Sequence, residues 1–244
     1  MKAVITAGGR IDGAFAVEAG TAVKALAVVR GNTMLDRIIQ ALRGAGASRI
    51  ALVGGSQVRA AAQNQVDRFI DESPSGSQNM LRALRAWPDD GEALLYATSD
   101  LPYVTAATIT DFVKRVPPQT LGVALSEHTD YVDRFPGAPT AGITLAGERV
   151  VNGGVFVIPG GSVEPLAAIA TQFFDARKRP WQMAGLVGAP VLLRFVLRRL
   201  SIADLERRAR QTLGVQALGL RNCAPELAFD VDGENEYRYA LAHE

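Results

Sequence analysis

The sequence contains very few of the residues on which disulfide, zinc and nucleophile–base chemistry depend. Cys223 is the single cysteine in 244 residues, so an intrachain disulfide is excluded, as expected for a protein of the reducing cytosol. His128 and His243 are the only 2 histidines, and neither lies in a zinc-ligand spacing or in a recognisable triad. Function is therefore expected to depend on carboxylates, basic side chains and glycines.

Long apolar runs and a large net charge are also missing. No run of apolar residues is long enough for a membrane-spanning helix, which needs about 18 or more. The 26 basic and 25 acidic residues leave a net charge of +1, so an overall basic field for nucleic acid is absent. Residues 1–5 run directly into a strand-like segment without the features of a signal peptide, so we expect a cytoplasmic protein.

Short apolar runs alternate with segments of helical spacing along most of the chain. This β-α-β-α order predicts an α/β fold, with a mostly parallel sheet covered by helices on both faces. Residues 227–229 are also strand-like. The other predicted strands are residues 3–6, 50–53, 93–97, 122–125 and 155–158, and the predicted helices are residues 34–45, 79–86, 105–116 and 234–242.

The segment from about residue 162 to residue 213 is almost entirely helix-like and rich in arginine. We predict one domain over residues 1–244, with this segment as a helical insertion. The preferred interpretation is a packed helical subdomain or a dimer contact with solvated arginines. Peripheral contact with a membrane surface, or with an anionic lipid-linked acceptor, is the alternative. The oligomeric state is not readable from the sequence.

A glycine turn, Thr6-Ala7-Gly8-Gly9-Arg10, follows the first predicted strand. Open α/β sheets bind ligands at the carboxyl ends of their strands, and glycines let backbone N–H groups approach phosphates or a base. Arg10 could grip a phosphate with its planar guanidinium. A tight turn with a surface arginine is the alternative. The P-loop pattern and the Gly-x-Gly-x-x-Gly dinucleotide fingerprint are both missing.

Four charged residues elsewhere in the chain fit phosphate chemistry. Lys24 stands between a glycine-rich stretch and an apolar run, from which it could reach an α-phosphate; a solvated lysine is the alternative. Asp100 follows a predicted strand and suits Mg²⁺, although it could also cap a turn. Asp230 and Asp232 lie on one side of an extended segment and could complete a metal site, unless Asp232 caps the last helix.

Taken together, these motifs resemble the MobA-like nucleotidyltransferase superfamily. That superfamily includes molybdenum-cofactor guanylyltransferase and sugar-phosphate nucleotidyltransferases. Two further segments, Ser77-Gln78-Asn79 and Asn152-Gly153-Gly154, resemble a turn that contacts the base or ribose and a loop on the acceptor side. The matching motifs are residues 6–10, 23–26, 31–35, 100–102 and 230–236.

The resemblance implies a GT-A-like, Rossmann-like three-layer sandwich and a Mg²⁺-dependent enzyme. In the implied reaction, a phosphorylated small molecule attacks the α-phosphorus of an NTP, and pyrophosphate leaves. The implied catalytic residues are Arg10, Lys24 and Asp100, and the implied metal ligands are Asp100, Asp232 and Asp230. The nucleotide would contact Ala7, Gly8, Gly9, Arg10, Lys24, Gly54 and Asn79, and the acceptor would contact Asn152 and Gly153.

The sequence departs from the family pattern at three points. The loop between Arg10 and Lys24 is long, the proline usual before the lysine is Val23, and the last motif ends in Gly-Glu-Asn-Glu instead of Thr-Pro-Glu-Asp. Two other functions therefore stay open: a GT-A-type glycosyltransferase that uses a nucleotide sugar, and a catalytically silent nucleotide-binding protein. Neither the base of the NTP nor the acceptor is readable from the sequence.

Overall fold

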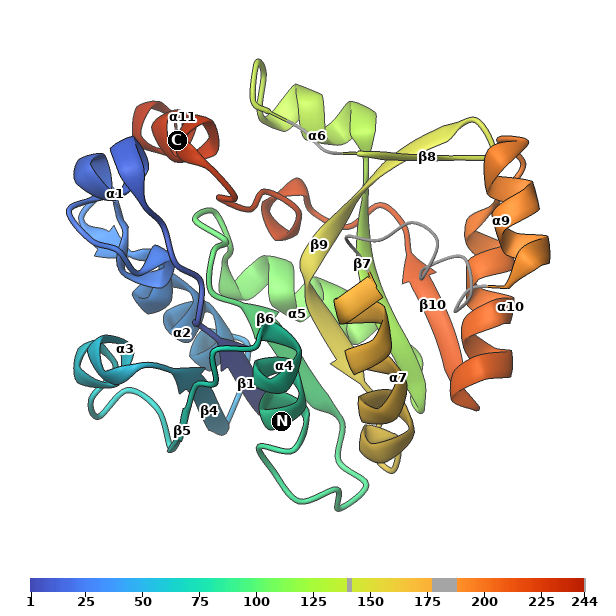
Figure 1. Cartoon of the computed structure of the whole chain (residues 1–244), viewed down its shortest axis with the longest axis horizontal. Coiled ribbons are helices and arrows are strands. Elements are labelled where there is room, and N and C mark those ends of the chain that lie inside the picture. The colour runs from blue at the N-terminus through green and yellow to red at the C-terminus, as the bar shows by residue number, and fades with distance from the viewer. Residues whose placement is uncertain (140–141, 177–187, 244) are drawn as a thin grey trace.

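A central sheet covered by helices on both faces organises the protein (Figure 1). The computed structural model describes residues 1–139, 142–176 and 188–243. The strand order is β10-β7-β9-β6-β1-β4-β5, with β8 paired to β9, which makes an 8-stranded sheet. Its strands are β1 (Lys2–Thr6), β4 (Arg49–Gly54), β5 (Arg68–Asp71), β6 (Leu94–Thr98), β7 (Thr120–Glu127), β8 (Ile143–Leu145), β9 (Glu148–Ile158) and β10 (Gln216–Leu220).

The sheet is mostly parallel, as predicted. Strand β1 pairs in parallel with β4 and β6, β4 with β5, and β7 with β10. Strand β9 is antiparallel to both β6 and β7, and β8 is antiparallel to β9. The carboxyl ends of β1, β4 and β6 therefore meet at one edge of the sheet, where ligands bind in folds of this type.

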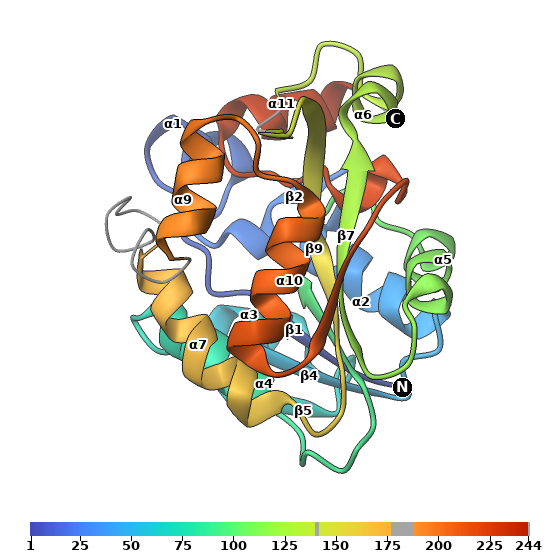
Figure 2. The ribbon, with the colours of Figure 1, turned by 90° about the vertical axis from the view of Figure 1, so that its right-hand side faces the viewer.

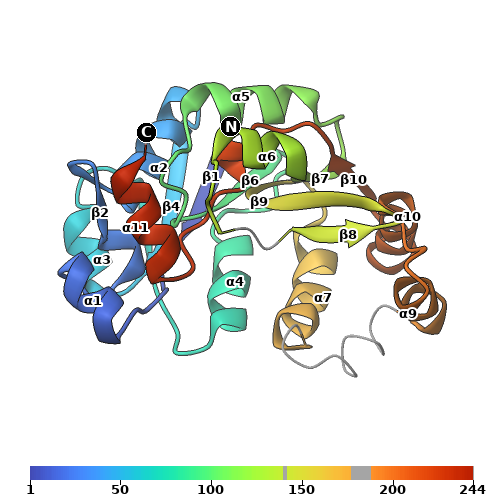
Figure 3. The ribbon, with the colours of Figure 1, turned by 90° about the horizontal axis from the view of Figure 1, so that it is seen from above.

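Figure 3 shows the helices on both faces of the sheet. Helices α2 (Met34–Gly44) and α5 (Ala106–Arg115) lie together on one face, while α4 (Gly76–Leu84), α7 (Val163–Ala176) and α10 (Ile202–Leu213) lie on the other. The remaining elements are α1 (Gly13–Ala19), η1 (Lys24–Leu26), β2 (Val28–Val29), β3 (Asn32–Thr33), α3 (Ser56–Ala61), α6 (His128–Arg134), α9 (Ala189–Val196), η2 (Pro225–Leu227) and α11 (Glu234–Ala242). None of the helices in the described part of the chain has the length and apolar character that crossing a membrane requires.

Apolar spacing explains why α2 forms and where it packs. Its buried residues Leu35, Ile38 and Leu42 recur at helical intervals, so they share the face that meets the sheet. Thr33 caps the helix by accepting a hydrogen bond from the Asp36 N–H at 3.0 Å. Each such buried side chain stabilises the fold by about 1.5–3 kcal/mol, which fixes the helix beneath the first strands.

Several predicted elements differ from the observed ones. Residues 227–229 are not a strand, because the 3-10 helix η2 covers Pro225–Leu227 and a proline at its start cannot donate to a β-ladder. The predicted strand 155–158 is the last part of β9, which spans 11 residues. Strands β5 and β10 were not predicted, because their short sequences, Arg68–Asp71 and Gln216–Leu220, hold no long apolar run.

The predicted helical insertion contains α7, α9 and α10. Helix α7 packs against α4, and α10 packs against β10, so both help to cover the sheet. Figure 2 shows α9 beside α10 on the outer side of this layer. Residues 177–187, which include Arg177 and Arg179, lie outside the described residues. The boundaries of the single domain and of its insertion stay predictions.

Candidate active site

The glycine turn after β1 lies close to two segments that are distant in the sequence. The Gly9 carbonyl accepts a hydrogen bond from the Lys24 N–H at 3.0 Å, which ties the turn to the start of η1. A Cβ at Gly8 would stand 2.8 Å from Glu72 Oε2, and a Cβ at Gly9 would stand 3.2 Å from Lys24 Cε. The lack of a side chain at both positions lets Glu72 and Lys24 lie close against the backbone of the turn.

Lys24 links the first part of the chain to two distant carboxylates. Its ammonium Nζ lies 2.6 Å from Asp100 Oδ2 and 3.0 Å from Asp232 Oδ1. The Val231 N–H donates to the Asp100 carbonyl at 3.0 Å, so the backbone of the last acidic motif is attached to the end of β6. Asp232 does not cap α11, because the residue that precedes this helix is Gly233. The Asp232 carboxylate accepts a hydrogen bond from Lys24 instead.

The charges around Lys24, Asp100, Asp230 and Asp232 favour the binding of a further cation. Burial lowers the pKa of Lys24, but Asp100 and then Asp232 outweigh that effect, so the net pKa lies above the ordinary value. Asp230 is exposed on one side, yet desolvation by the surrounding protein, together with repulsion from Asp232 and Asp100, raises its pKa to about 7. Three carboxylates thus share a single nearby ammonium among the groups that shift the pKa of Asp230.

The same carboxylates suit a divalent cation of the magnesium type. Asp100 Oδ1 is buried and has no hydrogen-bond partner among the described residues, so one of its oxygens is left for a ligand. Over residues 1–139, 142–176 and 188–243, no three His, Cys, Asp or Glu side chains form a ready-made metal cluster. Magnesium does not require one, because it binds one or two carboxylates together with phosphate oxygens and waters.

A cavity of about 620 Å³ opens beside Lys24 and Asp100. It lies at the carboxyl ends of β1 and β6, under the amino end of α4, and Thr6 Oγ1 hydrogen-bonds Tyr96 Oη within it at 3.0 Å. The volume matches the size range of small-molecule sites. Its lining residues are Thr6, Gly8, Gly9, Arg10, Lys24, Glu72, Ser73, Pro74, Gly76, Asn79, Met80, Tyr96, Thr98, Ser99 and Asp100.

Glu72 is the main side chain of this cavity that sequence reasoning missed. Its carboxylate accepts from the Arg10 guanidinium, which also donates to the Gly8 carbonyl at 3.3 Å. Asn79 hydrogen-bonds the backbone of Ser73 on both sides, accepting from the N–H at 2.6 Å and donating to the carbonyl at 2.9 Å. In this arrangement, Arg10 and Asn79 both hold the loop that begins at Glu72. No motif marks that residue, since it follows the short, unpredicted strand β5.

The predicted site residues do not all converge. Gly8, Gly9, Arg10, Lys24, Asn79 and Asp100 line the cavity, and Asp230 and Asp232 stand beside Lys24. Ala7 and Gly54 are buried behind the cavity wall, and the Gly54 carbonyl accepts from the Glu72 N–H at 3.0 Å, which positions that residue.

The two predicted acceptor residues lie farther along the sheet, on β9. Gly153 faces η2, because a Cβ there would stand 2.7 Å from the Leu227 carbonyl oxygen. Asn152 is exposed and lines a different, apolar cavity next to α10. The two residues therefore border different surroundings, and their role toward an acceptor stays a prediction.

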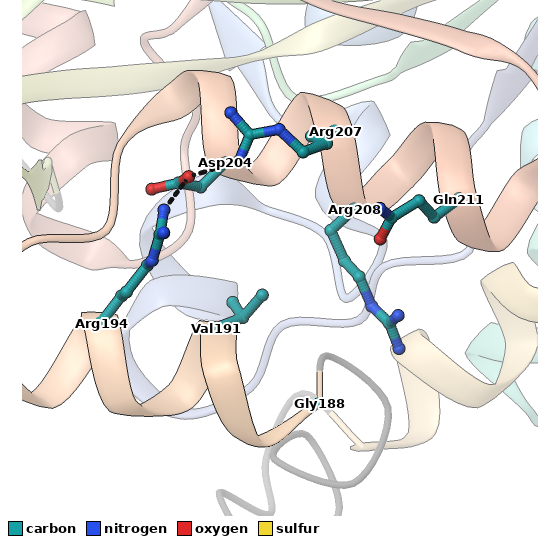
Figure 4. A pocket seen from close by; sticks show the side chains of 7 residues that line it. All are labelled: Gly188, Val191, Arg194, Asp204, Arg207, Arg208 and Gln211. Atoms are coloured by element: carbon teal, nitrogen blue, oxygen red, sulfur yellow. Dashed lines mark hydrogen bonds and ion pairs between the residues drawn. The ribbon is translucent and has the colours of Figure 1, made fainter.

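A smaller cavity of about 180 Å³ lies between α9 and α10, and Asp100, Asp230 and Asp232 are not among the residues that line it (Figure 4). Arg194 of α9 and Arg207 of α10 both donate to Asp204 of α10. Because one carboxylate engages both guanidinium groups, we interpret this cavity as part of the packing between the two helices.

Comparisons with known proteins agree with this geometry. A family model described as MobA-like NTP transferase domain matches residues 3–216. No curated protein is significantly similar to the chain in sequence. A hypothetical transferase from Thermus thermophilus is similar in structure, with a TM-score of 0.84 and 28% identity, over 97% of this chain and 100% of that chain.

Two more distant structures share the fold. One is 2-C-methyl-D-erythritol 4-phosphate cytidylyltransferase, also from Thermus thermophilus, with a TM-score of 0.54 and 16% identity, over 99% of this chain and 97% of that chain. The other is a Mycobacterium tuberculosis protein in complex with manganese, with a TM-score of 0.54 and 18% identity, over 100% of this chain and 98% of that chain.

Proposed function

Because this chain belongs to the MobA-like NTP transferase family, we propose that it transfers a nucleoside monophosphate from an NTP to a phosphorylated small molecule. One observation carries the proposal: Lys24 reaches both Asp100 and Asp232 beside the glycine turn, at the carboxyl edge of the sheet. These residues are far apart in the sequence, and their convergence provides both cationic and anionic groups around one cavity. Positioning and charge neutralisation are the main requirements of phosphoryl chemistry.

The side chains divide the work according to their charge. Arg10 and Lys24 bind the phosphates and stabilise the charge that develops when the acceptor oxygen attacks the α-phosphorus and pyrophosphate departs. Gly8, Gly9 and Asn79 hold the nucleoside in the cavity. Asp100 and Asp232, with Asp230, would hold Mg²⁺, which would neutralise charge on the phosphate oxygens. The manganese complex of a structural neighbour supports a divalent ion in this fold.

A thermal-shift screen of the four NTPs with Mg²⁺ tests the nucleotide site. A ligand that binds only the folded state raises the melting temperature, so the correct NTP should stabilise the protein when Mg²⁺ is present. Asp100→Ala should abolish the Mg²⁺-dependent part of the shift. The matched control is Asp111→Ala, because Asp111 forms only an exposed pair with Arg115 on α5. A full Mg²⁺-dependent shift in Asp100→Ala would show that the metal assignment is wrong.

Pyrophosphate release separates the proposed transferase from its alternatives. A nucleotidyltransferase releases pyrophosphate from an NTP, whereas a glycosyltransferase that uses a nucleotide sugar does not. Binding of NTP without pyrophosphate release with any phosphorylated acceptor would favour a silent nucleotide-binding protein. Both Arg10 and Lys24 line the cavity, which favours the transferase. Pyrophosphate, its leaving group, needs more positive charge for stabilisation than the nucleoside diphosphate that a glycosyltransferase releases.

Helix α9 favours a second, peripheral role at an anionic membrane surface. Residues 192–199 are all exposed, and they include Leu193 at 60% exposure and Val196 at 68%. Arg198 and Arg199 stand next to these apolar side chains, while Arg194 is paired with Asp204. Basic and apolar residues together on a surface helix are typical of membrane contact.

A further inference from the structure

A second concave site lies on the face of the sheet that α10 covers. This apolar cavity has a volume of about 210 Å³ and lies between β7, β8, β9, β10 and α10. Its walls include Val123, Leu125, Leu145 and Ile202, while Ile143 at 46% exposure stands where the cavity meets solvent. The cavity is thus a built apolar site that is open to ligands from outside.

Polar groups are scarce in its lining. Asn152 and Glu206 are the polar side chains among the described residues that line it. Glu206 Oε1 accepts a hydrogen bond from the Gly219 N–H at 2.8 Å, so this carboxylate is already engaged. A sugar would leave its hydroxyl groups without partners here, which costs binding free energy, whereas a hydrocarbon group would not.

The cavity and the proposed transfer centre are both bordered by helices of the same face of the sheet, α10 in one case and α4 in the other. Asn152, which lines the apolar cavity, and Gly154 are two residues apart on β9, where the pairing with β7 changes register. A methyl group on Gly154 would collide with Thr98 Oγ1, so Gly154 lies directly against a residue that lines the nucleotide cavity. The buried Thr98 hydroxyl has no hydrogen-bond partner among the described residues.

These observations indicate the chemical class of the acceptor. We propose that the acceptor is an amphiphilic phosphate monoester, whose phosphate lies by Thr98 and Lys24 and whose aryl or alkyl group fills the apolar cavity. This inference rests on the proposed nucleotidyltransferase function. In the reaction, an oxygen of the acceptor's phosphate forms a new bond to the α-phosphorus of the NTP, and the bond between that phosphorus and the departing pyrophosphate breaks. An apolar cavity of about 150 Å³ accepts benzene, so the 210 Å³ here admits a somewhat larger group.

An alkyl phosphate series on the wild-type protein provides the first test. Methyl, butyl, hexyl and octyl phosphate are compared by thermal shift with Mg²⁺ and the preferred NTP, and by pyrophosphate release. Each methylene buried in the cavity should tighten binding by up to about fourfold, and the gain should stop once the cavity is full. A flat series, with faster turnover of ribose 5-phosphate or glucose 1-phosphate, would overturn the amphiphilic acceptor and leave the nucleotidyltransferase function intact.

A matched pair of variants on α10 locates the binding site. Ala209 lines the apolar cavity and Ala203 is exposed on the same helix outside it, so Ala209→Phe fills the cavity and Ala203→Phe is the control. Ala209→Phe should raise the KM for octyl phosphate at least tenfold, leave the KM for NTP unchanged, and remove the chain-length dependence. Equal KM values for octyl phosphate in the two variants would contradict the proposed site.

The binding arm separates failure of this inference from failure of the proposed function. The thermal shift caused by 2-naphthyl phosphate is measured without NTP, against inorganic phosphate as reference. A larger shift with 2-naphthyl phosphate that disappears in Ala209→Phe supports the apolar site even when no acceptor releases pyrophosphate, a result that would count against the transferase alone. Equal shifts with both compounds in the wild-type protein would overturn the apolar site whatever the activity.

Discussion

Replacing Lys24 by methionine removes the ammonium that lies between Asp100 and Asp232. The side chains of Lys24 and Asp100 are only 15% and 14% exposed, so Asp100 would be left as a largely buried charge without its partner. An unsatisfied buried polar group costs about 1–3 kcal/mol, more when charged, and the 74% exposed Asp232 adds little. We therefore expect Lys24→Met to lower the free energy of unfolding by about 2 kcal/mol.

For a chain of this length, about 2 kcal/mol corresponds to a melting temperature lower by about 4–8 °C. Mg²⁺ should restore more of the melting temperature in Lys24→Met than it adds to the wild-type protein, because without the ammonium the metal ion neutralises negative charge on Asp100 and Asp232 that Lys24 no longer compensates. Pyrophosphate release should nevertheless fall by about 10²–10³-fold, the typical effect of removing one group that stabilises transition-state charge.

Differential scanning fluorimetry with and without Mg²⁺ measures the stability effect, and a coupled pyrophosphate assay measures the activity. Lys114→Met is the control, because Lys114 is an exposed lysine on α5. The reasoning is refuted if Lys24→Met melts at the wild-type temperature and Mg²⁺ raises both melting temperatures equally. That result would mean that Lys24 does not neutralise the two carboxylates in solution.

Three further predictions concern the acidic group, the glycine turn and α9. The pKa of Asp230 is about 7 in the folded state and about 4 in the unfolded state, so the folded state holds the proton more tightly and the free energy of unfolding should fall as pH rises between these values. Urea unfolding in metal-free buffer should show this fall, and Asp230→Asn should remove its contribution; equal slopes would contradict the pKa. Gly8→Ala places a methyl group 2.8 Å from Glu72 Oε2, and the KM for NTP should rise at least tenfold while the acceptor KM changes little; an unchanged KM for NTP would argue against the cavity as the nucleotide site. Wild-type protein should co-sediment with anionic but not neutral liposomes, and Leu193→Glu should reduce this; no binding to either liposome would end the membrane role.

The sequence predicts the centre of the fold well because burial leaves a strong pattern there. The strands around residues 3–6, 50–53 and 93–97 are almost entirely apolar runs, and they are observed as β1, β4 and β6. Residues that follow such strands must meet at one edge of a parallel sheet, which is why the glycine turn and Asp100 could be expected to lie near each other. Lys24 follows no predicted strand, and only the family resemblance indicated that it would join them. The functional roles of these residues stay proposals.

The rest of the site depends on tertiary contacts that leave no local pattern. Glu72 reaches Arg10 only because β5 pairs with β4, and the four residues of β5 carry no period that identifies a strand. Asn152 and Gly153 were grouped because their segment resembles a loop on the acceptor side, yet both lie within the long strand β9. Without knowing that β9 extends from Glu148, the sequence could not show which face each residue occupies.

Strand β9 runs in the opposite direction to its neighbours, and this places the proposed acceptor site and the proposed nucleotide site on different segments of the chain. Because β9 is antiparallel to β6, the first residues of β9 lie at the edge of the sheet where β6 ends. They belong to the β8–β9 hairpin, whose residues do not line the nucleotide cavity. Gly154 of β9 contacts that cavity through Thr98. If the acceptor binds in the apolar cavity as proposed, substitutions or insertions in this hairpin would alter acceptor choice, while the glycine turn and the carboxylates Asp100, Asp230 and Asp232 would keep their arrangement. A chimera that exchanges only residues 143–152 would carry the acceptor preference of its donor and the NTP preference of its host.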